Sequence, residues 1–576
     1  MNQPQGKKLN GLLVAGFIIA IGILFTVLQV QQSLFQGQLS LPITYDDISY
    51  FVDSMRRLNR FYDQGLARLV IDFFQVPPHS VTSALTPLLG FSIFGSQDWA
   101  PAATNGIYVI AFLFFISHIT LHLSWLYRVA IAGVAITCPL MGHLVIESRP
   151  DILCGLATAC AAFLILQNPD FQKKRNHQIL AGVTVSLALL AKPSISPITT
   201  IIVLSALLFS FFGGLYTYQH GLNAEIEKYK GLKKILAVLK QYQIFLVTTL
   251  FLCLPYYLVA IRRIVSYIYL NIFGADKELW QNQDSFTGQA LYYITGPGGK
   301  AMFSSWGPIV FLVILLALLT AVLNRDWQRL RKISPYVGII SITYLLVTIP
   351  KTKSIFLGMA FGGMVLLSTL YLLIYSAEVL EKRSSSRINR ILGRATCVAL
   401  LTISLSTFQW TLFNKFGSPN TASVTQVVYE KQLIDSISQR MHDKLATATP
   451  QCAPQIAFTA EAPYLNGAVL EYKWRKQRIT NFTMWTESRS NNLSEHWADI
   501  KQSDYVIAFS ADNPTQMSWL PSNKIQRRLL RRLRSSPQFK LIDTFERPAP
   551  LGGGKVFLYE SEQPCKFLPA ATGKLY

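Results

Sequence analysis

Residues 41–60 read LPITYDDISYFVDSMRRLNR and follow the first long apolar segment of the chain directly. Two adjacent carboxylates, Asp46 and Asp47, stand near the start of this stretch. Apolar and aromatic side chains then recur at helical spacing, at Phe51, Met55, Leu58 and Tyr62. This spacing predicts an amphipathic helix that lies at the membrane surface with an acid pair in its first turn. Because acids also favour the first turn of any helix, capping alone is the alternative role for the pair.

The composition predicts a polytopic α-helical membrane protein. Of the 576 residues, 51% are hydrophobic and only 15% are charged. Apolar segments near the length that crosses about 30 Å of hydrocarbon recur along the chain, so we expect about eleven transmembrane helices. They lie at about 12–30, 104–125, 129–147, 152–167, 179–191, 195–215, 243–261, 306–323, 335–349, 355–376 and 396–413. The first is expected to be a retained anchor rather than a cleaved signal peptide.

The basic connections predict how the chain is oriented. Lys and Arg gather at residues 7–8, 173–175, 228–240, 325–332 and 382–394, and these segments all fall on one side of the predicted spans. The positive-inside rule makes that side cytoplasmic. Much of the net charge of +22 is explained in this way, without nucleic acid as a partner. An odd number of spans then places the C-terminus outside the cytoplasm.

The part after about residue 414 has a different composition. Helical patterns at 429–445 and 521–534 alternate with strand-like runs at 455–460, 504–510, 539–545 and 555–561. We therefore expect an extracytoplasmic α/β domain at 414–576, behind a membrane domain at 1–413 with an outer loop at 32–103. Cys452 and Cys565 bracket the α/β part and are candidates for a disulfide in an oxidising compartment. The arginines of 527–534 predict a solvated helix face, with anionic headgroups as the alternative contact.

Charged side chains from well-separated turns are expected to meet at the outer face. They are Asp46, Asp47, Arg149, Asp151, Lys192, Arg262, Arg263, Lys351 and Lys353. A carboxylate can take the proton of an attacking hydroxyl, and fixed cations stabilise the charge on a departing phosphate. For any one of these residues, an ordinary interfacial charge that finishes a helix end is the alternative. All of them on one face fit a reaction on a lipid-linked phosphate.

The order of these features resembles the class C glycosyltransferases. The resemblance is to the branch with polyprenyl-phosphate-dependent protein mannosyltransferases and lipid A aminoarabinose transferases, and it covers about residues 1–380. An acid pair flanked by aromatic residues is matched by Tyr45, Asp46, Asp47 and Tyr50. Later motifs are matched by PPHSVTSALTPLLGFSIFG at 77–95, which contains His79, by Pro150 and Asp151, by AKPS around Lys192, by PYY from Pro255 and by PKTKS at 350–354.

The resemblance implies an inverting transfer, with Asp46 as general base toward an acceptor hydroxyl. Residues implied to bind the substrate or its phosphate are Tyr50, His79, Arg149, Asp151, Lys192, Arg262, Arg263, Lys351 and Lys353. The donor would be a sugar on polyprenyl phosphate, and the acceptor a lipid, glycan or protein at the outer face of a bacterial cytoplasmic membrane. Two departures, Asp47 in place of the common Glu and Pro193 in place of a frequent Gly, leave donor and acceptor open. A divalent metal is possible, although only Asp46, Asp47 and Asp151 are available as ligands.

Three other functions are alternatives to sugar transfer from polyprenyl phosphate. A transporter or flippase of lipid-linked sugars would carry paired broken helices and polar sites at mid-membrane. A non-catalytic factor for envelope-glycan assembly would need neither acid. An outer-leaflet ligase that uses pyrophosphate-linked oligosaccharide would carry Arg and His in a long late loop, whereas residues 262–305 are short and lack His. The gathering of charge at one face favours the transferase.

Overall fold

The computed structural model describes residues 5–42, 46–167, 171, 174–217, 240, 242–272, 274, 285–303, 306–324, 333–382, 387–413, 424–449, 452–485, 491–510, 517 and 520–562. Tyr45, Cys565, the whole basic connection 325–332 and most of 228–240 lie outside these residues. The chain divides into two compact units. The first contains Met1–Gln32, Phe73–Thr86 and Ala102–Ser418, and the second contains Ser33–Asp72, Pro87–Pro101 and Pro419–Tyr576. Parts of the predicted outer loop 32–103 therefore pack with the C-terminal part.

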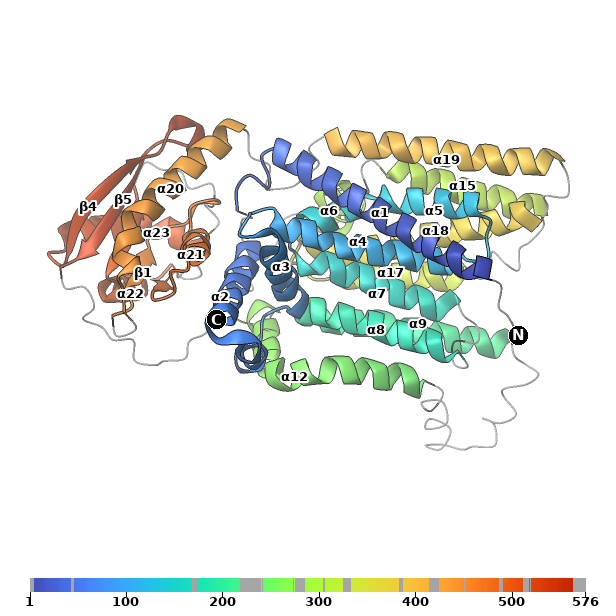
Figure 1. Cartoon of the computed structure of the whole chain (residues 1–576), viewed down its shortest axis with the longest axis horizontal. Helices are drawn as coiled ribbons and strands as arrows, with labels where there is room; N and C mark the ends of the chain where they lie inside the picture. Colours follow the sequence, from blue (N-terminus) through green and yellow to red (C-terminus); the bar gives the residue numbers. More distant parts are fainter. Residues whose placement is uncertain are drawn as a thin grey trace. The chain divides into compact units, whose positions relative to one another are not determined.

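The first unit is helical, and its helices run broadly alongside one another (Figure 1). The helices are α1 (Gln5–Phe35), α4 (Ala100–Ile119), α5 (Trp125–Ile136), α6 (Pro139–Ile146), α7 (Pro150–Gln167), α8 (Arg175–Ala191), α9 (Ser196–Thr217), α12 (Gln243–Ile272), α13 (Phe286–Leu291), α14 (Pro297–Phe303), α15 (Gly307–Asn324), α17 (Ser334–Thr348), α18 (Met359–Lys382) and α19 (Arg387–Phe413). Short 3-10 turns, η2 (Pro193–Ile195) and η4 (Phe356–Gly358), precede α9 and α18.

The chain is a multi-pass helical membrane protein. Among the described residues, six helices are long and apolar enough to cross a membrane, or up to eight if each of two bent helix pairs counts as one span. All eleven predicted segments lie on helices, but three of them fall short of this criterion. These three lie on α8, on α17 and on Arg394–Thr407 within α19. The structure thus supports the helical architecture with fewer clear spans than the sequence predicts.

Helix α7 is the buried centre of the first unit. Of its 18-residue apolar window, 89% is buried, as expected of a helix that is apolar on every side. A Cβ atom added at Gly155 would stand 2.4 Å from the carbonyl carbon of Met359, so glycine allows α7 and the start of α18 to touch through their backbones. A hydrogen bond of 3.1 Å between the hydroxyls of Thr158 and Thr199 joins α7 to α9. This packing fixes the N-terminal end of α7, where Asp151 stands.

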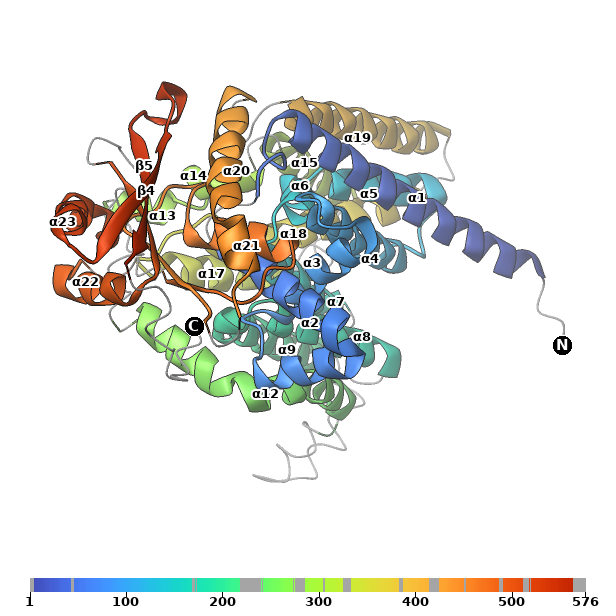
Figure 2. The same cartoon turned by 60° about the vertical axis from the view of Figure 1, so that its left-hand side comes forward.

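The second unit contains a five-stranded mixed sheet. Its strands are β1 (Gln455–Phe458), β2 (Thr483–Trp485), β3 (Tyr505–Phe509), β4 (Phe539–Glu546) and β5 (Lys555–Ser561), in the order β2-β1-β3-β5-β4. Strands β2, β1 and β3 are parallel, while β5 is antiparallel to both of its neighbours. Its helices are α20 (Val424–Ala446), α21 (Gly467–Lys476), α22 (Leu493–Gln502) and α23 (Pro521–Ser535). Seen edge-on in Figure 2, the sheet has α22 and α23 on one side and α20 and α21 on the other.

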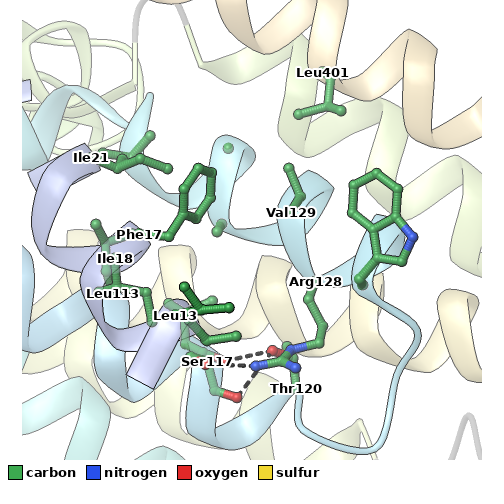
Figure 3. A pocket seen from close by; sticks show the side chains of 16 residues that line it. Leu13, Phe17, Ile18, Ile21, Leu113, Ser117, Thr120, Arg128, Val129 and Leu401 are labelled. Atoms are coloured by element: carbon green, nitrogen blue, oxygen red, sulfur yellow. Dashed lines mark hydrogen bonds between the residues drawn. The ribbon is translucent and has the colours of Figure 1, made fainter. Parts of the chain in front are cut away.

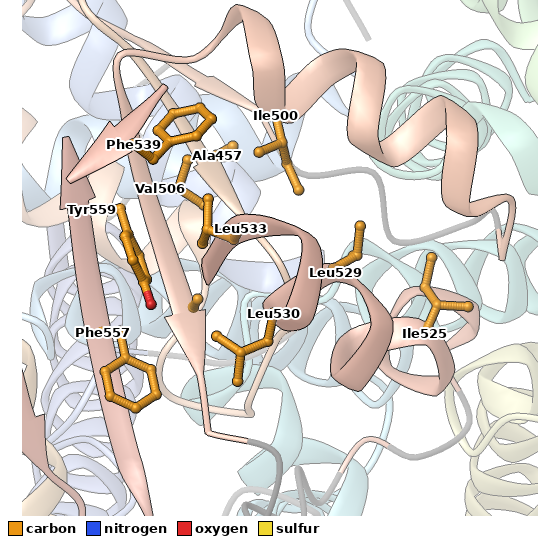
Figure 4. Close-up of a cluster of buried hydrophobic side chains, with 11 residues drawn as sticks. Ala457, Ile500, Val506, Ile525, Leu529, Leu530, Leu533, Phe539, Phe557 and Tyr559 are labelled. Carbon is orange, nitrogen blue, oxygen red and sulfur yellow. The ribbon is translucent and has the colours of Figure 1, made fainter. Parts of the chain in front are cut away.

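The amphipathic pattern of α23 explains how it packs. Its leucines point at the sheet, and Leu529 and Leu533 are fully buried in a cluster with Val506 and Tyr559 (Figure 4). The arginines of 527–534 are exposed on the opposite face. Every helix and strand expected in the C-terminal part is present, while the short elements α21, α22 and β2 were not expected. Cys452 is disulfide-bonded.

Candidate active site

The acid pair stands at the beginning of α2 (Asp46–Gln75), in the second unit. Asp46 is the first residue of the helix, and Asp47 is fully buried. Tyr50, one turn further on, is also buried, at 6% exposed. The sequence prediction of a helix opened by two acids is therefore confirmed at this position, and the two acids occupy consecutive positions in its first turn.

The predicted apolar face of α2 is confirmed for three of its four residues. Phe51, Met55 and Leu58 are at most 4% exposed. Tyr62, the fourth residue of this face, is 49% exposed. It stands one turn before Gly65, whose φ of 78° and ψ of −179° interrupt the helix, and the guanidinium of Arg478 covers its ring at 4.9 Å.

A buried ion network bridges this interruption. Arg57 is completely buried, and its guanidinium lies 2.9 Å from a carboxylate oxygen of Asp53 and 2.9 Å from one of Asp72. Arg60 pairs with the second oxygen of Asp72. The spacing of Asp53 and Arg57 on one helix face could have suggested their contact. Asp72 lies beyond the break, so helical periodicity could not have predicted its role.

The C-terminal part packs directly on α2 within the second unit. The Phe51 ring lies 5.5 Å from the ring of Phe91, in α3 (Val81–Phe94), and 5.5 Å from that of Tyr472, in α21. The Tyr472 hydroxyl donates to Asp98 Oδ1 at 3.0 Å, and Lys476 pairs with the same oxygen at 2.8 Å. The helix that carries the acid pair, residues 87–101 and the α/β part thus form one packed body, which sequence reasoning missed.

Two predicted residues form an ion pair in the first unit, close in the sequence to a third. Lys192 follows the last residue of α8, and its Nζ lies 3.1 Å from Oδ2 of Asp151, in the first turn of α7. Both side chains are largely buried, at 14% and 6% exposed. The guanidinium of Arg149 lies 4.1 Å from the ring centroid of Phe356, in η4. Lys192 thus pairs with Asp151, while Arg149 stands two residues before Asp151 and packs on Phe356. These three residues are called the cation cluster below.

The turn that carries Arg149 is held by groups that sequence reasoning missed. Asn105 donates to the carbonyl oxygens of Val145 and Glu147, at 3.1 and 3.2 Å. His143 Nδ1 lies 3.0 Å from Glu147 Oε1, and the i,i+4 spacing of the two residues is the signal that could have revealed the pair. Glu147 Oε2 is buried without a hydrogen-bond partner among the described residues. An acceptor oxygen thus remains beside the cation cluster.

The two lysines of the PKTKS turn have different surroundings. Lys353 Nζ donates to the carbonyl oxygens of Val347 and Thr348, at 3.3 and 2.6 Å, and also to that of Pro350. It therefore satisfies the carbonyl groups at the C-terminal end of α17, which is a structural role. Burial lowers the pKa of Lys353. Lys351 is exposed.

Arg262 and Arg263 do not open an outer loop, so that expectation was wrong. Helix α12 continues to Ile272, because the residues that follow the arginines are helix-compatible and no Gly or Pro occurs before Gly274. Both arginines are exposed on the helix, and Arg263 Nη1 donates to the carbonyl oxygen of Pro77 at 3.4 Å. The exposed His79 packs its ring 4.7 Å from that of Tyr267. Arg263 and His79 therefore belong to a contact between α12 and residues 77–80.

A metal site is not built into the described part of the chain. Within it, no group of three or more His, Cys, Asp or Glu side chains is arranged to hold a metal ion. The acid pair belongs to the second unit and Asp151 to the first.

Solved structures share this fold. The chain resembles the arabinofuranosyltransferase AftD from mycobacteria with a TM-score of 0.53 and 12% identity, over 96% of this chain and 40% of AftD. It resembles ArnT from Cupriavidus metallidurans in the apo state, with a TM-score of 0.51 and 11% identity over 92% of this chain and 97% of ArnT. For ArnT bound to undecaprenyl phosphate the values are 0.52 and 11%, over 95% and 98%. No protein-family model and no curated protein matches the chain. The fold expected from the resemblance is confirmed.

Proposed function

We propose that the chain, which has the fold of the class C membrane glycosyltransferases, transfers a sugar from a polyprenyl-phosphate carrier to an acceptor hydroxyl. One observation carries the proposal. The chain matches nearly the whole of ArnT in a structure that holds undecaprenyl phosphate. The acid pair at the head of α2 supplies carboxylates for the proposed chemistry. The acceptor is a lipid, glycan or protein, and the reaction takes place at the outer face of a bacterial cytoplasmic membrane.

Asp46 is the general base of the proposed reaction. Its carboxylate removes the proton of the acceptor hydroxyl as the hydroxyl oxygen attacks the anomeric carbon. The bond from that carbon to the carrier phosphate breaks on the opposite side, so the configuration inverts and polyprenyl phosphate leaves with the electron pair. Asp47 is fully buried, which leaves Asp46 as the proton acceptor.

The cation cluster binds the carrier phosphate in this proposal. Lys192 and Arg149 supply ammonium and guanidinium groups that stabilise the charge developing on the departing phosphate. Asp151 holds Lys192 in place through the 3.1 Å ion pair. Lys351 is exposed on the turn before η4 and is the further cation available to the donor. The polyprenyl tail lies along the apolar helices.

Replacing Asp46 by Asn tests the mechanism directly. The full-length protein in nanodiscs is offered a panel of undecaprenyl-phosphate-linked sugars together with envelope extract, and the release of undecaprenyl phosphate is followed by mass spectrometry. Asn keeps a capping oxygen but cannot take the proton, so release should fall by about a hundredfold or more, while undecaprenyl phosphate still binds. The matched control is Asp63→Asn, an exposed acid in the same helix. Wild-type release by the Asp46→Asn variant would sink the proposal.

A transporter of lipid-linked sugars is the second candidate function. One observation favours it: α5 and α6 meet at 61°, with Pro139 opening α6, and broken helices of this kind are common in transporters. Movement of a fluorescent undecaprenyl-phosphate lipid across proteoliposomes separates the two functions. A transporter moves the lipid equally well with Asp46→Asn, whereas the transferase releases the sugar and depends on Asp46.

A further inference from the structure

A cavity of about 440 Å³ opens between α1, α4, α5 and α19 in the first unit (Figure 3). Its wall is mainly aliphatic and aromatic, with Phe17 and Ile18 from α1, Leu113 from α4, Val129 from α5 and Leu401 from α19. A cavity of this size can hold a small organic ligand or one alkyl chain of a lipid. Because the wall offers almost no hydrogen-bonding groups, the part of a ligand that fills it has to be apolar.

One end of the cavity is polar, and among the described residues that line it Arg128 is the only charged one. Its guanidinium is half-buried and donates to the hydroxyl of Ser117 at 2.7 Å. Figure 3 shows Arg128, Ser117 and Thr120 together at this end, away from Leu401. No carboxylate of the described residues pairs with Arg128. Trp125, which also lines the cavity, is 72% exposed, as is typical of a side chain at the membrane interface.

A cation beside an apolar cavity needs an anion. A hydroxyl partner satisfies one N–H group but leaves the charge uncompensated, and charge in a medium of low polarity is costly without a counter-charge. The ligand that meets both demands has an anionic head and an apolar chain. Bilayer lipids with a phosphate group combine these features, and basic residues near the surface attract anionic lipids in particular.

The position of the cavity separates it from the cation cluster. Arg128 stands near the start of α5, and α5 and α6 together span residues 125–146, up to the turn before Arg149. The cavity therefore lies toward the opposite end of the helical bundle from Arg149 and Asp151. Helix α1, which forms one wall, has only 28% of its apolar window buried, so a chain in the cavity would complete its packing.

We propose that this cavity binds one anionic phospholipid of the bilayer. The lipid phosphodiester forms a charge-assisted bond with Arg128 beside Ser117, and one acyl chain lies between α1, α4 and α5. The lipid joins α1 to the rest of the bundle. This inference does not depend on the proposed transferase activity, and the site is separate from the cation cluster.

Native mass spectrometry of the full-length protein tests the site. The protein is released from nanodiscs of phosphatidylcholine that contain a minor share of phosphatidylglycerol. One retained phosphatidylglycerol is expected. Arg128→Gln should lower its retention by about tenfold or more, because the charge-assisted bond to the phosphate is lost. The matched control is Arg394→Gln, which removes an exposed arginine of α19 that does not line the cavity.

A second variant keeps the charge and fills the space. Ala132 lines the cavity from α5, and Ala132→Phe should expel the lipid while Arg128 remains. Retention of phosphatidylglycerol by both variants at the wild-type level would overturn the proposal. Retention of phosphatidylcholine equal to that of phosphatidylglycerol would also overturn it, because the site would then not distinguish an anionic head group from a neutral one. A retained mass that corresponds to a polyprenyl phosphate would assign the cavity to the carrier instead.

Discussion

Replacing Arg57 by Met should destabilise the second unit more than any exposed charge change in α2. Arg57 is fully buried and links Asp53 to Asp72 across the helix break at Gly65. Methionine fills similar space but leaves the carboxylate of Asp72, whose side chain is 1% exposed, without its most deeply buried partner. Uncompensated buried charge is one of the few single changes that cost several kcal/mol.

The magnitude follows from the burial of the partners. Removing one member of a buried pair costs about 3–5 kcal/mol. Arg60 still pairs with Asp72, although its own side chain is 35% exposed, so we expect a value near the lower end, about 3 kcal/mol. For a domain of about 150–250 residues, this corresponds to a fall in Tm of about 6–12 °C. Tryptophan fluorescence of the full-length protein in detergent, followed on heating, measures the fall.

Two further variants make the experiment decisive. Arg56→Met removes a neighbouring arginine that is 24% exposed, and it should change Tm by only about 2 °C or less. The double variant Arg57→Met, Asp72→Asn removes the stranded charge and should recover more than half of the loss. The reasoning is refuted if Arg57→Met has the same Tm as Arg56→Met, or if the double variant has the lowest Tm of the three.

Two other expectations concern a partly buried acid, Glu461, and a partly buried lysine, Lys353. Burial raises the pKa of Glu461 from 4.5 to about 7, so the folded protein keeps a proton that the unfolded chain releases between these values. The free energy of unfolding should therefore fall by up to about 3 kcal/mol as the pH rises from about 4.5 to about 7. Glu461→Gln should lessen this fall when Tm is measured across the pH range. The control Glu546→Gln, at a side chain that is 73% exposed, should leave the fall unchanged. Lys353→Gln should lower the free energy of unfolding by about 1 kcal/mol, and with it Tm, because contacts at the end of α17 are lost. It should leave the affinity for undecaprenyl phosphate unchanged, whereas Lys192→Gln should lower that affinity. Lost affinity with an unchanged Tm in Lys353→Gln would instead assign Lys353 to the phosphate.

Much of the fold could be predicted because its signals are local. An apolar run of about 20 residues has few alternatives to a helix. A basic helix with apolar residues at i, i+4 and i+8, as at Ile525, Leu529 and Leu533, has one face to bury. The short elements were missed for the same reason. Strand β2 has three residues, and α21 and α22 have ten each, so their patterns are too brief to stand out.

The candidate site was predicted less completely, because its contacts join distant residues. Asp151 and Lys192 could be placed on one face, yet no periodic pattern shows that they pair at 3.1 Å. The end of α12 was misplaced because the charges of Arg262 and Arg263 were taken as a helix end, while the apolar residues after them continue the helix. Charged residues mark the end of a helix only where a helix-breaking residue also occurs, and here the first glycine after the arginines is Gly274.

The division of the chain into units changes how the C-terminal part is understood. A boundary at residue 413 would make it an appendage, but α21 contributes Tyr472 and Lys476 to Asp98, and Tyr472 packs on Phe51 of α2. The proposed base thus belongs to the same packed body as the α/β part, while the cation cluster belongs to the helical bundle. Variation in the α/β part would therefore act first on the helix that carries the proposed base.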